Sequence, residues 1–289
     1  MPQSYAWGVE AQVDLYEACA VLGGERVELQ VFAMRSMACG AAYHRAYTHA
    51  TQQAFLEAHE LAFAYFDGVF KLLRYDNLKS AVKKILRGYR REETSRFIAF
   101  RWHWRFQSEF CNPARGNEKG GVEGEGGYFR RNHVPLPQVR DLEELNAYLE
   151  QCCRQDQQRI LEGRSETVGT AMLRERPHRL PLAAERFELA ESSFPTVDGL
   201  RCVRVRTNRY STPLPPGTRV EARVYADYVE VWHEGVCRAR HERCYRRLQQ
   251  ILDLEHYLDV SPPTSNTLTF SVALRQALAA AWTCIQAAG

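Results

Sequence analysis

Two stretches near the start of the chain carry an apolar side chain at every second position. They cover residues 7–20 and 26–34. Alternation with a period of two is typical of a strand that buries one face. Gly23 and Gly24 stand between the stretches and predict a turn. We therefore expect two consecutive strands joined by a tight turn.

The pattern then mixes strands with helices. A third strand is predicted over residues 41–47, and residues 51–66 place their large apolar side chains on one helical face. Gly68 is expected to end that helix. This order predicts an α/β domain. The elements expected after it are a strand at 69–75, helices at 78–86 and 92–104, a strand at 106–110, a glycine-rich loop and an amphipathic helix at 141–160.

Alternation with a period of two returns after Phe187 and persists for most of the remaining chain. His233, Glu234 and Gly235 interrupt it where a hairpin turn would fall. A small β-barrel fits this stretch best. We expect four parts: an α/β core at residues 1–135, a helical connector at 136–185, a small barrel associated with DNA at 186–260, and a divergent tail at 261–289.

Length and composition bound the class of protein. The 289 residues, 45% of them hydrophobic, can form one enzyme-sized domain and a smaller module. No apolar run is long enough to span a membrane and no signal core is present, so we expect a cytoplasmic protein without a membrane partner. The nine cysteines are scattered without a CxxC pair, which favours reduced thiols over zinc sites or disulfides.

Other common catalytic motifs are incomplete in this sequence. His59 begins an HELAF string that lacks the second histidine of a zinc protease, and Gly116–Gly121 lacks the GK[ST] ending of a phosphate-binding loop. There is no GxSxG elbow either. The histidines are therefore expected in the core or on the surface.

Positive charge is concentrated in one segment of the chain. The net charge is only +3, yet residues 74–131 contain fourteen Lys and Arg against seven Asp and Glu. Lys79, Lys83 and Arg87 follow one another at intervals of four, so a helix would line them along one face. That face could hold a phosphate backbone, or it could simply be solvated.

Three carboxylates stand out by their context. Asp14 lies within an apolar strand pattern, Asp76 ends another, and Glu123 stands where a helix could begin after the glycine-rich loop. Converging carboxylates can hold two Mg²⁺ ions about 3.5–4 Å apart, as metal-dependent phosphoryl transfer requires. An aspartate in a strand pattern is more often an edge or turn residue. Context alone therefore leaves open whether these acids are metal ligands or ordinary edge and turn residues.

Three strings of this sequence resemble a known family: QVDLYEA, the segment FLEAHELAFAYFDGVFKLLRYDNLKSAVKKILRG, and EFCNPARGNEKGGVEGEGGYFRRN. They are similar to the core of IstA-type transposases, which belong to the retroviral-integrase-like superfamily with an RNase H-like fold, a mixed sheet flanked by helices. The resemblance implies that Asp14, Asp76 and Glu123 are the catalytic triad and bind two Mg²⁺ or Mn²⁺ ions. Asn77 and Glu118 are candidates for groups beside those ligands. The expected DNA-binding residues are Lys79, Lys83, Lys84, Arg87, Lys119, Arg130 and Arg131.

The resemblance also implies a reaction and partners. The reaction would be phosphodiester hydrolysis at transposon ends, followed by attack of the freed 3′-hydroxyl on target DNA. The partners would be DNA, an AAA+ ATPase of the IstB type, and further copies of the chain assembled on DNA.

Two features depart from the family pattern. No room for a helix-turn-helix region precedes Asp14, so we expect an N-terminally truncated chain, and the family pattern is lost after Val260. The alternatives are therefore a catalytically silent DNA-binding remnant of a transposase and a stand-alone RNase H-like nuclease.

Overall fold

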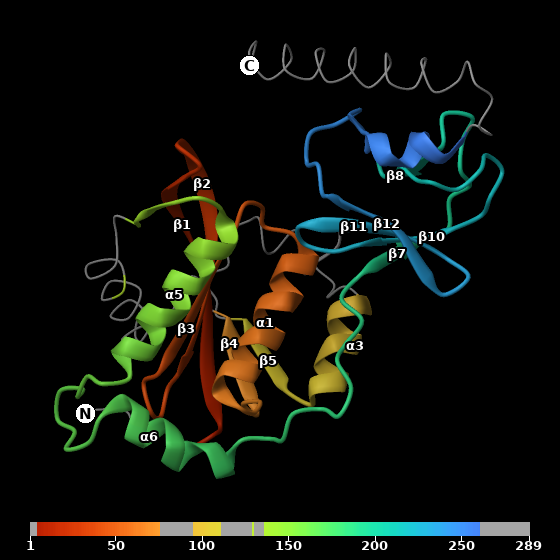
Figure 1. The fold of residues 1–289 in the computed structure, drawn as a ribbon. Coiled ribbons are helices and arrows are strands. Elements are labelled where there is room, and N and C mark those ends of the chain that lie inside the picture. Colours follow the sequence, from red (N-terminus) through yellow and green to blue (C-terminus); the bar gives the residue numbers. More distant parts are fainter. Residues whose placement is uncertain (1–4, 76–94, 111–128, 130–135, 261–289) are drawn as a thin grey trace. The chain divides into compact units, whose positions relative to one another are not determined.

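The computed structural model describes residues 5–75, 95–110, 129 and 136–260. The chain divides between Leu189 and Ala190 into two compact units, each considered by itself (Figure 1). The predicted subdivision into core, connector, barrel and tail remains a prediction.

A mixed β-sheet forms the centre of the first unit. Its path runs β3-β2-β1-β4-β5, and β6 also pairs with β1. The long strand β1 is antiparallel to β2 and parallel to β4. The predicted mixed sheet is therefore confirmed. The strands are β1 (Glu10–Leu22), β2 (Glu25–Ser36), β3 (Ala42–Tyr47), β4 (Leu72–Tyr75), β5 (Gln107–Phe110) and β6 (Gln138–Val139).

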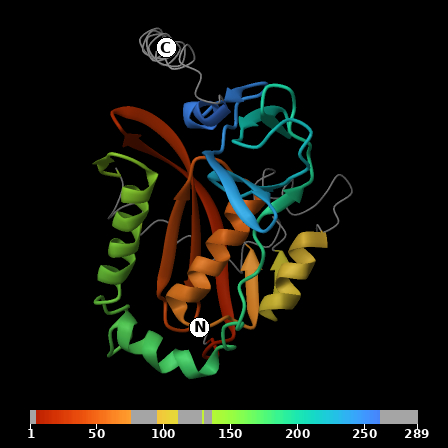
Figure 2. The ribbon, with the colours of Figure 1, turned by 45° about the vertical axis from the view of Figure 1, so that its right-hand side comes forward.

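Helices cover both faces of this sheet. Figures 1 and 2 show α5 (Leu142–Asp156) on one side, and α1 (Gln52–Phe66) with α3 (Ser95–Trp104) on the other. On the α5 side, Tyr16, Leu29 and Val31 of the sheet share a buried cluster with Leu145 and Leu149. The core of the unit is therefore layered, with the sheet in the middle.

The helix ends differ in detail from the prediction. Thr51 caps the start of α1, since its hydroxyl accepts a hydrogen bond from the Ala54 amide at 3.2 Å. Asp67 rather than Gly68 takes the left-handed cap position, with φ of 50°. Helix α5 ends at Asp156, earlier than the predicted residue 160, because Ile160 instead pairs with Thr167 in a β-bridge. The helix predicted at 78–86 lies outside the described residues.

A helix that the pattern did not reveal, α6 (Val168–Glu175), is held to the sheet by the hydrogen bonds of a buried carboxylate. It is followed by a 3₁₀ turn, Arg176–His178. The Glu175 carboxylate lies 2.9 Å from Arg179 Nη2 and accepts hydrogen bonds from the Gly8 amide and the Ser36 hydroxyl. Gly8 precedes β1 and Ser36 ends β2, so this carboxylate fixes the end of the sheet at which β1 begins.

The second unit consists of β-strands in two sheets. Their orders are β12-β11-β10-β7 and β13-β9-β8, and both contribute to one apolar cluster that includes Val203, Tyr210 and Val231. The predicted turn at residues 233–235 joins β11 to β12. A closed barrel is not shown among the described residues. The elements are β7 (Glu191–Ser193), β8 (Cys202–Val205), β9 (Asn208–Ser211), β10 (Glu221–Val224), β11 (Tyr228–His233), β12 (Val236–Glu242), β13 (Gln250–Ile251) and a 3₁₀ turn (Leu254–Val260).

Two expectations about composition can be compared with the described part of the chain. None of its helices has the length and apolar character needed to cross a membrane. The seven cysteines within it carry free thiols.

Candidate catalytic site

Asp14 lies in the middle of the central strand β1, opposite Ala33 of β2. Its Oδ1 atom accepts a hydrogen bond from the Leu15 amide at 2.8 Å, and the residue is half-buried. Successive side chains of a strand point to opposite faces, so Asp14 shares a face with Tyr16, which packs on the α5 side. A hard oxygen ligand therefore stands on that face of the sheet, as binding of Mg²⁺ requires.

Among the described residues, the last pair of the parallel ladder between β1 and β4 is Val13 and Tyr75. Asp14 is the next residue on β1. Asp76 is the next residue in sequence after Tyr75, but it lies outside the described residues. So do the other predicted site residues: Glu123, Asn77, Glu118, Lys79, Lys83, Lys84, Arg87, Lys119, Arg130 and Arg131.

Within the described ranges, no three His, Cys, Asp or Glu side chains gather as a metal site. Two of the three predicted metal ligands fall outside these ranges, so the predicted triad remains a prediction.

A row of charged and polar residues crosses the sheet next to Asp14. Gln12, two residues before Asp14 and on the same face, pairs with Arg35 of β2 and with Arg74 of β4. The Arg74 guanidinium lies 3.4 Å from a Glu10 carboxylate oxygen and 3.3 Å from one of Glu109. Two arginines therefore lie in the row next to Asp14, and the carboxylates of Glu10 and Glu109 contact Arg74. Sequence reasoning missed this row, because strand alternation alone does not give the register between strands.

Buried aromatic and polar groups occupy the same face on the other side of Asp14. The Tyr16 hydroxyl lies 3.2 Å from His44 Nδ1. The His44 ring stacks on Phe129, with centroids 3.7 Å apart and an interplanar angle of 16°. Phe129 is 1% exposed and comes six residues after Glu123 in the sequence. One end of the segment that follows Glu123 is thus packed against the face that carries Asp14.

The opposite face of the sheet carries a buried histidine without a catalytic arrangement. His59 Nε2 lies 3.0 Å from the Tyr75 hydroxyl, and its Nδ1 lies 2.7 Å from the Phe55 carbonyl oxygen. Burial lowers the pKa of His59 to about 3, so its ring is neutral near pH 7. Its place in the core agrees with the expectation for the histidines.

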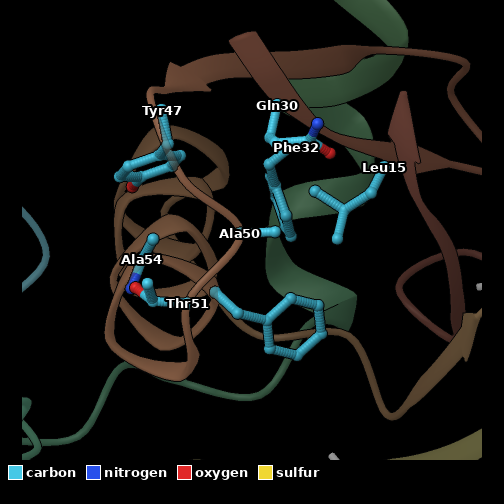
Figure 3. Close-up of a pocket in the computed structure, with 8 residues that line it drawn as sticks. Leu15, Gln30, Phe32, Tyr47, Ala50, Thr51 and Ala54 are labelled. Atoms are coloured by element: carbon cyan, nitrogen blue, oxygen red, sulfur yellow. The ribbon is translucent and has the colours of Figure 1, made fainter. Parts of the chain in front are cut away.

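A small cavity also lies on the α1 side (Figure 3). Leu15, Phe32 and Phe55 form much of its apolar wall. Because Leu15 and Asp14 are consecutive in a strand, their side chains point to opposite faces. The cavity is therefore separate from the face that carries the acid. Its remaining lining residues are Gln30, Tyr47, Ala50, Thr51 and Ala54.

The geometry defines a protein with a mixed α/β unit, a carboxylate on its central strand, and a β-rich second unit. Residues 182–253 match the family described as Mu transposase, C-terminal domain. Over 268 residues, 90% of this chain, the sequence is 35% identical to a transposase of Aminobacter aminovorans. Over the same length it is 32% identical to transposases for insertion sequences IS1326/IS1353 of Pseudomonas aeruginosa and Shigella flexneri.

These similarities confirm the predicted resemblance to transposases of insertion sequences. The chain spans 53% of the length of each of these relatives. The activity of a whole transposase is therefore a proposal for this chain.

Two solved structures show a weaker similarity to this chain, with 12% sequence identity. The simian T-cell lymphotropic virus intasome in complex with a PP2A regulatory subunit has a TM-score of 0.43 and 12% identity, over 85% of this chain and 84% of that one. The HTLV-2 integrase catalytic core domain in complex with magnesium has a TM-score of 0.41 and 12% identity, over 59% of this chain and 99% of that one.

Proposed function

We propose that this chain is the catalytic region of an IstA-type transposase, and that Asp14, Asp76 and Glu123 hold two divalent metal ions. The observation that carries the proposal is the register of the parallel strands β1 and β4. Val13 and Tyr75 are paired in this register, and each is followed in sequence by one of the two aspartates.

The register supports a pair of aspartates on one face. Neighbouring strands of a sheet lie about 4.7–4.9 Å apart, and residues in register share a face. A strand that continued for one residue would place Asp76 beside Asp14, on the face that α5 also covers.

The third carboxylate is supported by its connection to Phe129. Six residues separate Glu123 from Phe129, and an extended chain spans at most about 3.6 Å per residue. Phe129 is buried against His44, which contacts Tyr16 two residues along β1 from Asp14. This short separation in sequence is compatible with a third carboxylate from Glu123 on the face that carries Asp14.

The chemistry follows from this set of hard oxygen ligands. When bound, a pair of divalent ions activates the attacking water or hydroxyl and stabilises the leaving oxygen. The residues of the chain would hold and orient these ions, and the row that contains Arg35 and Arg74 would flank the site. The expected reactions are hydrolysis of a phosphodiester bond and transfer of a 3′-hydroxyl strand end to target DNA.

Several further assignments belong to the same proposal. The second unit would complete a small barrel associated with DNA, and Lys79, Lys83, Lys84, Arg87, Lys119, Arg130 and Arg131 would contact phosphates. An ATPase of the IstB type and further copies of the chain would be partners on DNA. The alternative is a silent DNA-binding remnant, which would bind DNA without metal-dependent chemistry.

The test is strand transfer from a labelled oligonucleotide with an exposed 3′-hydroxyl to a plasmid, with Mg²⁺ or Mn²⁺. We expect slow transfer with little preference for particular ends. Asp14→Asn and Asp76→Asn keep the side-chain shape but remove the charge that holds a divalent ion, so transfer should fall at least 100-fold, about 2.7 kcal/mol in activation free energy. DNA affinity should be kept or rise slightly.

Glu17→Gln is the matched control, because Glu17 is an exposed acid on the same strand. It should transfer at the rate of the unaltered chain. Equal activity in Asp14→Asn and the unaltered chain would refute the catalytic assignment. Firm DNA binding without transfer in any variant would establish the silent remnant instead.

A further inference from the structure

His44 lies in the same cross-strand row of the main sheet as Asp14. Asp14 of β1 is paired with Ala33 of β2, and Ala33 is paired with His44 of β3. Residues in register across a sheet share a face, and neighbouring strands lie about 4.7–4.9 Å apart. His44 therefore stands on the face that carries the acid, two strands away, and the residue between them has a small side chain.

The His44 ring is held in place from two sides. It is 2% exposed, and its Nδ1 atom lies 3.2 Å from the Tyr16 hydroxyl. The Phe129 ring stacks on it, with centroids 3.7 Å apart and an interplanar angle of 16°. Tyr16 and Phe129 share a buried cluster with Leu145 and Leu149 of α5. The imidazole is thus a fixed platform on which Phe129 rests.

The stack joins different parts of the chain from those joined by the other buried histidine of this unit, His59. The His59 ring lies 4.8 and 4.4 Å, between centroids, from aromatic rings of β2 and α1. Phe129 belongs instead to the stretch between β5 and β6, and Glu123 comes six residues before it. His44 therefore anchors the stretch that contains Glu123 to the row of Asp14.

The composition of the residues before Phe129 gives such an anchor a purpose. Three of the five residues between Glu123 and Phe129 are glycines, at positions 124, 126 and 127. Glycine loses more conformational freedom on ordering than any other residue. When one end of a short stretch is already fixed, fewer conformations remain to be lost as the acid at its other end binds an ion.

We propose that His44 is a positioning residue for metal binding, because its stack on Phe129 holds the stretch that contains Glu123 against the face of Asp14. The inference rests on the proposed function, which makes Glu123 the third metal ligand. His44 does not itself bind the ion. Its effect passes through Phe129 to Glu123, so it should disappear once the Glu123 carboxylate is removed.

The experiment measures the affinity of the full chain for Mn²⁺, from the electron paramagnetic resonance signal of the free ion during a titration. His44→Gln keeps a polar side chain but removes the ring, and Phe129→Leu keeps an apolar side chain but removes the stack. Each should weaken Mn²⁺ binding about 10-fold, as expected when a group that orients a metal ligand is lost. His59→Phe, on the opposite face, is the matched control and should keep the Mn²⁺ affinity of the unaltered chain.

His44→Phe separates positioning from stability. A phenyl ring can still stack on Phe129, so the Mn²⁺ affinity should be kept, whereas the lost hydrogen bond to the Tyr16 hydroxyl should lower the midpoint of thermal unfolding. A purely structural role would leave the Mn²⁺ affinity of the folded chain unchanged in His44→Gln and Phe129→Leu. That result would overturn the proposal, and so would an equal loss of affinity in His44→Phe and His44→Gln.

A double variant tests the route through Glu123. Adding His44→Gln to Glu123→Gln should weaken Mn²⁺ binding no further, because the carboxylate that His44 positions is already gone. Losses that multiply would show that the ring acts elsewhere and would contradict the inference.

Asp14→Asn tests the proposed function separately. It should weaken Mn²⁺ binding whatever the His44 variants do. If Asp14→Asn and Glu123→Gln weaken binding but His44→Gln and Phe129→Leu do not, only the positioning role is refuted. Unchanged Mn²⁺ affinity in Asp14→Asn and Glu123→Gln would refute the proposed metal site, and the positioning role with it.

Discussion

At the scale of single residues, the two faces of β1 serve different purposes. Asp14 keeps a carboxylate on the α5 side, whereas His59 and Tyr75 form a buried hydrogen bond on the α1 side. His59 also packs against Phe32 and Phe55, with ring centroids 4.8 and 4.4 Å away. A neutral imidazole suits this aromatic surrounding, since a buried charge without an ionic partner is costly.

His59 should make the free energy of unfolding depend on pH. The unfolded histidine binds a proton near pH 6.5, whereas burial lowers the folded pKa to about 3. Acidification from pH 6.5 towards 3 therefore favours the unfolded chain, and this contribution to stability is fully present only above about pH 6.5. Between pH 7 and pH 5 it amounts to about 2 kcal/mol.

Urea unfolding of the unaltered chain and of His59→Phe at these two pH values measures this contribution. The pH dependence should shrink by about 2 kcal/mol in the variant. Burial also lowers the pKa of His241 and His256 in the second unit, so part of the dependence should remain. An identical pH dependence in both chains would contradict the assignment.

At the scale of elements, β3 lies at one end of the path of the main sheet and depends on α5 for polar contacts. The Asn146 side chain of α5 accepts a hydrogen bond from the Ala46 amide at 2.7 Å and donates one to the Ala46 carbonyl at 3.0 Å. One side chain thus pairs both backbone groups of a residue near the end of β3. Unpaired groups on an edge strand invite pairing with other chains, and this contact prevents it at Ala46.

Asn146→Ala should destabilise the first unit by about 2–4 kcal/mol, because two buried backbone groups would lose their partners. The amide of Ala46 should then exchange its hydrogen faster than amides in β1. Glu143→Ala, an exposed change on the same helix, is the control and should shift the unfolding free energy by less than about 0.5 kcal/mol. Unchanged protection of the Ala46 amide in Asn146→Ala would show that the helix does not secure this strand.

At the scale of the whole chain, charge is distributed unevenly rather than in large excess. The net charge is +3, yet residues 74–131 contain fourteen Lys and Arg against seven Asp and Glu. Localised clusters of this kind attract a polyanion without making the whole protein strongly basic. Binding to DNA should therefore weaken steeply with salt.

Replacing Lys83, Lys84 and Arg87 with alanine should flatten the slope of log affinity against log salt by up to about 2.7. These residues lie outside the described part of the chain, so the prediction rests on their spacing in the sequence. The measurement is titration of DNA into each chain at several salt concentrations. An unchanged slope would mean that this face is only solvated.

Much of the first unit follows from the sequence by itself. The alternation in residues 7–20 and 26–34 predicts β1 and β2, and the apolar face of residues 51–66 predicts α1, because local side-chain periodicity matches local backbone geometry. The position of Asp14 within a strand was predicted in the same way. Short elements such as α6, with eight residues, give too few turns for a clear period.

Contacts between distant segments were decided only by the tertiary structure. The register that pairs Val13 with Tyr75, the stacking of His44 on Phe129 and the hydrogen bonds of Asn208 each join residues that are far apart in sequence. Strand alternation shows which residues share a face but not which strands are neighbours or how they are aligned. The sequence therefore determined the acid on β1, and packing determined which charged and aromatic groups surround it.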